Sequence, residues 1–206
     1  GESIADGGVT GDEAGEAGRV VVDEAARLTR LVEDLLDLAR LGADDFRLEP
    51  APTDLAVLLE QAAGTWSPRA EATGARFVVE HPGRPLVVQT DAGRVRQVLD
   101  GLVANALRLT PAGRPVVLAA RATPTGAVLE VRDGGPGLTA EDRAVAFEPG
   151  ALGERYRDER PVGVGIGLSL VHGLVQRLGG GIAVGVAPEG GAQFTVTLPA
   201  AAPSRP

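Results

Sequence analysis

Residues 126–138, GAVLEVRDGGPGL, combine a strand pattern with a run of glycines. The pattern at 127–132 predicts a strand, and a Pro/Thr/Gly turn joins it to a second predicted strand at 116–120, so a hairpin is expected. Asp133 follows directly, and three of the next four residues are glycine. A carboxylate at a strand end can accept a hydrogen bond from the amino group of adenine, while glycines keep the adjoining wall thin. Taken alone, a tight turn explains the segment more simply, because Asp-Gly is common in turns.

Helices and strands are predicted on both sides of this hairpin. Thr90 or Asp91 is expected to cap a long helix at 92–109. Asp54 is expected to cap the short helix that begins at residue 55. The order of elements favours an α+β sandwich, with helices on one face of a mostly antiparallel sheet. It does not alternate strictly between strand and helix, which argues against a Rossmann fold. The other predicted elements are helices at 55–63 and 167–178 and strands at 76–80, 86–89, 182–186 and 193–198.

The N-terminal part of the chain has a different character. Residues 1–18 are rich in Gly, Glu and Asp and predict a loop or a frayed end. Residues 19–41 carry apolar side chains at alternating steps of three and four, which predicts an amphipathic helix that needs a partner helix. Gly42 ends it. A linker at 43–54 then leads into a domain at 55–200, and residues 201–206 form a tail.

Composition excludes several classes of protein. The chain has 206 residues, 44% of them hydrophobic, and a formal net charge of −8, which argues against a nucleic-acid partner. There is no cysteine, and the two histidines lie far apart, so a zinc site is not expected. No apolar run approaches the roughly 20 residues that span a bilayer, and no signal peptide is visible, so the chain as given is expected to be soluble.

Two further segments have the composition of ligand sites. Asn105 is a polar residue in an apolar helix, and its amide oxygen suits Mg²⁺, although a buried structural asparagine is the simpler alternative. Residues 163–167, GVGIG, precede a predicted helix, where backbone N–H groups and the helix dipole favour phosphate. The loop lacks the Lys-Ser/Thr ending of a P-loop, and a purely structural loop is equally plausible in a chain with 29 glycines.

Taken in order, these segments resemble the Bergerat ATP-binding fold of histidine kinases and their relatives, the GHKL superfamily. Residues 96–110, RQVLDGLVANALRLT, are similar to its N box, and residues 131–138, VRDGGPGL, to its first glycine box. Phe147-Glu148-Pro149 resembles the F box. Residues 163–168, GVGIGL, resemble the second glycine box, and residues 194–199, FTVTLP, the closing strand.

The resemblance implies a role for each site residue. Asn105 would ligate Mg²⁺ bridging the phosphates of ATP, and Asp133 would bind the adenine amino group. Arg108 takes the position of a basic residue near the phosphates, or is a solvated surface charge. Residues 138–162 would form a mobile lid without regular structure over the nucleotide. The glycines would line the adenine pocket (Gly135, Gly137) or contact the phosphates (Gly163, Gly165, Gly167).

Residues 25–41, AARLTRLVEDLLDLARL, resemble the second helix of the dimerisation and phosphoacceptor hairpin of sensor kinases. This implies a homodimer, a response regulator receiver domain as partner, and a place in the cytoplasmic portion of an inner or plasma-membrane protein. The histidine box of the first helix is absent, and neither His81 nor His172 has the right setting. The phosphoacceptor is therefore expected upstream, and autophosphorylation is not expected from this chain alone.

One position departs from the family. Gly101 stands one helical turn before Asn105, where N boxes usually carry a second polar residue, so weakened Mg²⁺ or ATP binding is a hypothesis. A catalytically weak nucleotide-binding switch is accordingly the alternative to a kinase. An ATPase of the same superfamily is disfavoured, because Gly101 occupies the place of its general base.

Overall fold

The computed structural model of the chain describes residues 46–155 and 165–200 and, individually, Gly18, Ala25, Val32, Leu35, Leu36 and Leu41. The predicted helix at 19–41 is thus described at only five positions, all of them helical. Gly163 and the predicted tail at 201–206 lie outside the described residues.

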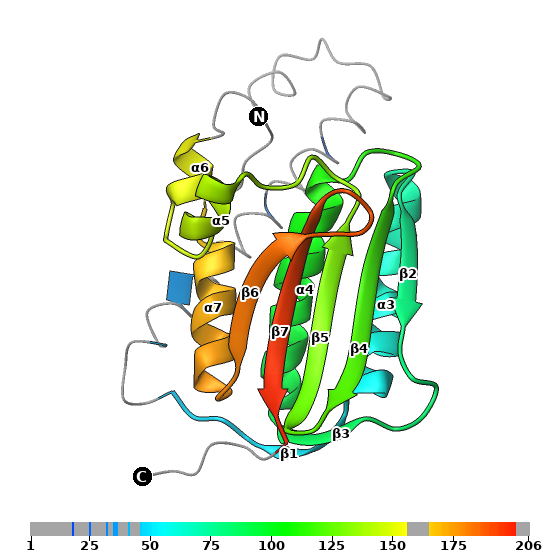
Figure 1. The fold of residues 1–206 in the computed structure, drawn as a ribbon, viewed down its shortest axis with the longest axis vertical. Helices are drawn as coiled ribbons and strands as arrows, with labels where there is room; N and C mark the ends of the chain where they lie inside the picture. The colour runs from blue at the N-terminus through cyan, green and yellow to red at the C-terminus, as the bar shows by residue number, and fades with distance from the viewer. Residues whose placement is uncertain are drawn as a thin grey trace.

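Two sheets contain the strands β1 (Ala51–Asp54), β2 (Arg76–Glu80), β3 (Val87–Thr90), β4 (Pro115–Thr123), β5 (Gly126–Asp133), β6 (Gly181–Val186) and β7 (Ala192–Pro199). The main sheet has the order β2-β4-β5-β7-β6, with β2 parallel to β4 and all other neighbours antiparallel. The short strands β1 and β3 pair separately, across one end of the main sheet (Figure 1). The predicted hairpin of β4 and β5 is confirmed, and so is the final hairpin of β6 and β7.

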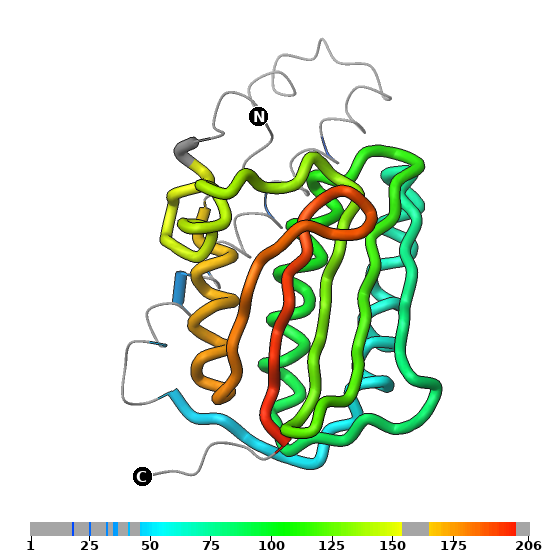
Figure 2. The backbone as a smooth tube through the Cα atoms, in the orientation of Figure 1, coloured from blue at the N-terminus to red at the C-terminus, as the bar shows by residue number. Residues whose placement is uncertain are grey.

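Three helices, α3 (Leu55–Ala72), α4 (Ala92–Leu109) and α7 (Gly167–Arg177), cover one face of the main sheet (Figure 1, Figure 2). The core between the two layers is apolar and nearly inaccessible to solvent. The predicted α+β sandwich, with its helices on one face, is confirmed. The largest core side chains include Leu118, Leu129 and Phe194 from the sheet and Leu59, Leu99 and Leu174 from the helices.

Aspartate caps start α3 and α4 where the sequence predicts them. Asp54 accepts a hydrogen bond from the backbone of Ala56, and Asp91 accepts one from the backbone of Arg94. The α3 helix is twice as long as predicted, because its buried stripe continues through Trp66 to Ala70 in spite of the internal Pro68. Burial of that stripe therefore outweighs the break that proline favours.

The segment between β5 and α7 contains short helices, where the sequence predicted a lid without regular structure. These are α5 (Ala140–Val145) and α6 (Ala151–Arg155). The start of α5 is a capping box, in which Thr139 Oγ1 accepts from the backbone of Asp142 and the Asp142 carboxylate accepts from the backbone of Thr139. Reciprocal capping of this kind stabilises a helix that has no apolar periodicity.

Leu41 and Phe46, which precede the domain, pack against α7 and α4. Leu41 is buried, its backbone carbonyl accepts a hydrogen bond from Arg177, and its side chain lies where a Cβ atom on Gly173 would be. The ring of Phe46 faces two guanidinium groups, that of Arg94 at 4.9 Å and that of Arg177 at 5.6 Å. Within the described ranges, no helix combines the length and apolar character needed to cross a membrane.

Candidate nucleotide-binding site

Asp133 is the last residue of β5, and its side chain is held in one orientation. The residue is 4% exposed, and its Oδ1 accepts hydrogen bonds from the backbone N–H groups of Gly135 at 2.9 Å and Ala192 at 3.2 Å. Burial raises the pKa of this carboxyl, the two N–H groups lower it in part, and the charge of Glu189 raises it further. Oδ2 accepts no hydrogen bond from the described residues, so it is available to a ligand.

The wall around this carboxylate is made of backbone. A Cβ atom on Gly191 would lie 2.0 Å from Asp133 Oδ1, and one on Gly135 would lie 2.8 Å from the carbonyl oxygen of Leu109. Gly137 has a φ of +71°, which glycine adopts without strain. The predicted thin wall is therefore present, and Gly191, which sequence reasoning did not single out, is part of it. The Gly190-Gly191 pair before the final strand was the available signal.

Asn105 and Arg108 lie together in the last turns of α4. Asn105 is half-buried, and its Oδ1 accepts a hydrogen bond of 2.6 Å from Nη2 of Arg108. Arg108 is exposed, although partial desolvation of its guanidinium lowers its pKa. Asn105 Oδ1, the oxygen that the sequence assigns to Mg²⁺, thus accepts a hydrogen bond from the Arg108 guanidinium. The two predicted residues are therefore in direct contact.

Gly101 lies where α4 and α7 approach each other closely. A Cβ atom at this position would be 3.0 Å from a methyl group of Val171, which is 2% exposed. At the position where the family pattern has a polar residue, α4 therefore makes a close contact with α7. A larger side chain at 101 requires Val171 to move.

The start of α7 leaves backbone groups without a side-chain cap. The N-cap residue is Ile166, and the hydroxyl of Ser169 donates to its carbonyl oxygen at 2.8 Å. Gly165 has a φ of +80° and accepts a hydrogen bond from the backbone of Gly150 at 3.0 Å, whereas among the described residues no atom lies within 4 Å of a Cβ atom built on Gly167. The first N–H groups of the helix can thus bind an anion.

Phe147 connects the segment after β5 to the rest of the domain. Its ring stacks on that of His172, with centroids 5.3 Å apart, and meets the edge of Phe194 at 6.4 Å. His172 therefore has a packing role on α7, which its place in an apolar helix did not reveal.

Two of the three groups of predicted site residues lie at one end of α4, and the third lies at the start of α7, which packs against α4. Gly135 lies against the Leu109 carbonyl at that end, Asn105 and Arg108 lie on the helix itself, and α7 packs against α4 beside Gly101. The described residues contain no cluster of carboxylates and histidines that could hold a metal ion. A magnesium ion here would depend on Asn105 together with oxygens supplied by the ligand.

Comparison with known proteins identifies the family. Residues 90–202, more than half of the chain, match the family described as histidine kinase-, DNA gyrase B-, and HSP90-like ATPases, so the chain belongs to this family.

The relatives include sensor kinases. The probable sensor histidine kinase TcrY of Mycobacterium tuberculosis is 37% identical over 181 residues, which cover 87% of this chain and 37% of TcrY. The alginate biosynthesis sensor protein KinB of Pseudomonas aeruginosa is 33% identical over 88% of this chain and 30% of KinB. The chain thus spans about a third of the length of these relatives.

Solved structures agree in fold. The Acinetobacter baumannii histidine kinase AdeS superposes with a TM-score of 0.75 at 25% identity, over 97% of this chain and 90% of that one. Full-length ShkA in complex with AMPPNP gives a TM-score of 0.77 at 32% identity, over 96% of this chain and 41% of ShkA.

Proposed function

We propose that this chain is the ATP-binding catalytic part of a sensor histidine kinase. The observation that carries the proposal is Asp133, whose Oδ1 is held by two backbone N–H groups while Oδ2 is free. A fixed carboxylate oxygen in a glycine-lined wall suits the amino group of adenine. Gly135 and Gly137 would line the base. The AMPPNP complex of ShkA supports a nucleoside triphosphate as the ligand.

The phosphates would lie between the end of α4 and the start of α7. Arg108 would turn from Asn105 to a phosphate oxygen, which frees Asn105 Oδ1 as a metal ligand. Bound Mg²⁺ would neutralise charge on the phosphates. The N–H groups at Gly165 and Gly167, with Gly163 from outside the described residues, would contact the phosphate oxygens.

The acceptor histidine is proposed to come from outside residues 1–206. His172 is stacked on Phe147, and His81 is paired with Glu60 at 2.9 Å, so both have other contacts. In the intact kinase, the γ-phosphate would pass to that histidine and then to a response regulator receiver domain. Residues 1–42 would belong to the dimerising hairpin, and this part of the protein would lie in the cytoplasm.

Two measurements test the proposal. Calorimetry should show Mg-ATP binding by the wild type and its loss in Asp133→Ala, because the base loses its acceptor. A transfer assay with a supplied phosphoacceptor hairpin and labelled ATP should then phosphorylate the histidine. Binding without transfer would contradict the kinase activity and leave a nucleotide-binding switch as the alternative.

A further inference from the structure

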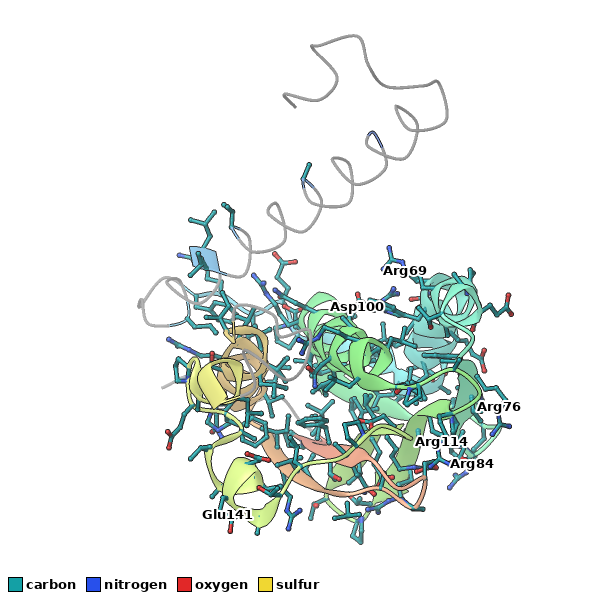
Figure 3. The ribbon with its side chains drawn as sticks, turned by 90° about the horizontal axis from the view of Figure 1, so that it is seen from above. Arg69, Arg76, Arg84, Asp100, Arg114 and Glu141 are labelled. Atoms are coloured by element: carbon teal, nitrogen blue, oxygen red, sulfur yellow. The ribbon has the colours of Figure 1, made fainter. Side chains whose placement is uncertain are left out.

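Arg114, in the loop between α4 and β4, joins two segments that surround Asp133. Its Nε donates to the carbonyl oxygen of Gly134 at 3.2 Å, and its Nη2 donates to the carbonyl oxygen of Glu189 in the turn between β6 and β7. Arg114 lies at the end of the sheet that faces the viewer in Figure 3. The sequence offers no signal for this role, because the residue is an exposed arginine beside a proline.

The first contact acts on the peptide unit that orients Asp133. The carbonyl of Gly134 and the N–H of Gly135 belong to one planar group. Arg114 holds the oxygen of that group, and Asp133 Oδ1 accepts from its N–H at 2.9 Å. Fixing the carbonyl therefore fixes the direction of the N–H that orients the carboxylate.

The second contact acts on the other donor to Asp133. Ala192, whose N–H reaches Oδ1, follows the turn that contains Glu189. The peptide after Glu189 is held at both ends, by Arg114 at its oxygen and by the Ala187 carbonyl at the Gly190 N–H, 2.9 Å away. The Glu189 side chain is also held, because its Oε1 lies 3.2 Å from Nη2 of Arg132.

We propose that Arg114 is a positioning residue for recognition of a 6-amino purine. By bracing both segments that donate to Oδ1, it aims Oδ2 of Asp133 at the base. The inference rests on the proposed binding of ATP and deepens it, since it assigns base selectivity to a residue that touches no part of the nucleotide.

The test compares ATP with ITP, in which an oxygen replaces the 6-amino group. Arg114→Met keeps the aliphatic stem and removes the donors. We expect it to weaken Mg-ATP binding by about five- to tenfold and Mg-ITP binding by less than about twofold, measured by calorimetry. Arg114→Lys should restore part of the ATP affinity, because an ammonium group can still donate to these carbonyls.

Arg76→Met is the matched control. Arg76 is exposed, and its backbone N–H donates to the Arg114 carbonyl at 3.0 Å. Its side chain, unlike that of Arg114, forms no hydrogen bond to the carbonyl of Gly134 or of Glu189. Both nucleotides should bind this variant as they bind the wild type.

Equal weakening of ATP and ITP in Arg114→Met would overturn the inference, since a structural role alone affects both. Unchanged ATP affinity would also overturn it. If Arg114→Met does not fold, Arg114→Lys decides, because an unaltered ratio of ATP to ITP affinity there contradicts the role. Failure of the wild type to bind ATP would instead overturn the proposed function itself.

Discussion

The two sides of the site are built by different means. Around Asp133, the peptide groups of the wall are hydrogen-bonded to each other, to the carboxylate or to Arg114. At the start of α7, Ile166 provides no side-chain cap, and a Cβ atom on Gly167 would meet no atom of the described part of the chain. The proposed base side is therefore organised before a ligand arrives, whereas the proposed phosphate side has backbone N–H groups without a side-chain cap. Preorganisation of this kind gives selectivity at a low entropic cost.

The largest expected effect reverses the polarity of the base side. Asp133→Asn can keep an oxygen facing the two backbone N–H groups, which turns the amide nitrogen toward the ligand. A donor then replaces the acceptor, so ATP affinity should fall about 10- to 100-fold, and ITP should become the preferred nucleotide. Competition binding of the two nucleotides measures this. Retained preference for ATP would show that Asp133 does not face the base.

The next prediction compares one glycine from each side. In Gly191→Ala, the new methyl group would lie 2.0 Å from Asp133 Oδ1, so we expect a loss of about 1–3 kcal/mol in the free energy of unfolding. Gly167→Ala adds a methyl group at a helix start where it meets none of the described residues, so it should be neutral or slightly stabilising. Denaturant unfolding of both variants measures the difference. Equal effects would contradict the contrast between the two sides.

Phe147→Ala tests how the segment after β5 is attached. The variant loses ring contacts with His172 and Phe194. We expect the free energy of unfolding to decrease by about 0.5–1.5 kcal/mol more than the loss of buried apolar area alone would cause. Amide hydrogen exchange should increase in α5 and α6 and stay unchanged in β5. A uniform increase over the whole domain would contradict a local attachment.

The smallest effect is a pH dependence. Because burial raises the pKa of Asp133, the folded protein retains this proton at a pH where the unfolded chain has released it. This carboxyl should therefore lower the free energy of unfolding progressively as the pH rises from its unfolded-state pKa through the raised value. Unfolding measured from about pH 4 to about pH 7 should show a gap between wild type and Asp133→Asn that changes with pH. A constant gap would contradict the raised pKa.

Local chemistry explains why much of the architecture was predictable. The caps at Asp54 and Asp91 and the β4–β5 hairpin depend on residues close in sequence. The parallel pairing of β2 with β4 was not predicted, because strand alternation does not encode the partner. The extension of α3 through Pro68 was missed for a related reason, since the burial of Trp66 and Ala70 is a tertiary effect.

The site shows the same division. Asp133 and the glycines next to it were found from one short segment. Their supports were not, because Ala192 and Arg114 reach the carboxylate and its neighbouring peptide from remote parts of the chain. The missing polar residue at 101 was visible in the sequence, but the packing around Gly101 was not. Only the structure shows that Val171 fills the space beside it.

The contact between Gly101 and Val171 also makes the effect of a substitution at one position depend on the residue at the other. Asparagine at 101 meets a buried methyl group as long as valine remains at 171. Shortening residue 171 first opens the space that the amide needs, while the reverse order passes through an overpacked intermediate. Substitutions at 101 and 171 are therefore expected to be non-additive, and a polar residue at 101 to be tolerated best when residue 171, on the neighbouring helix, is also shortened.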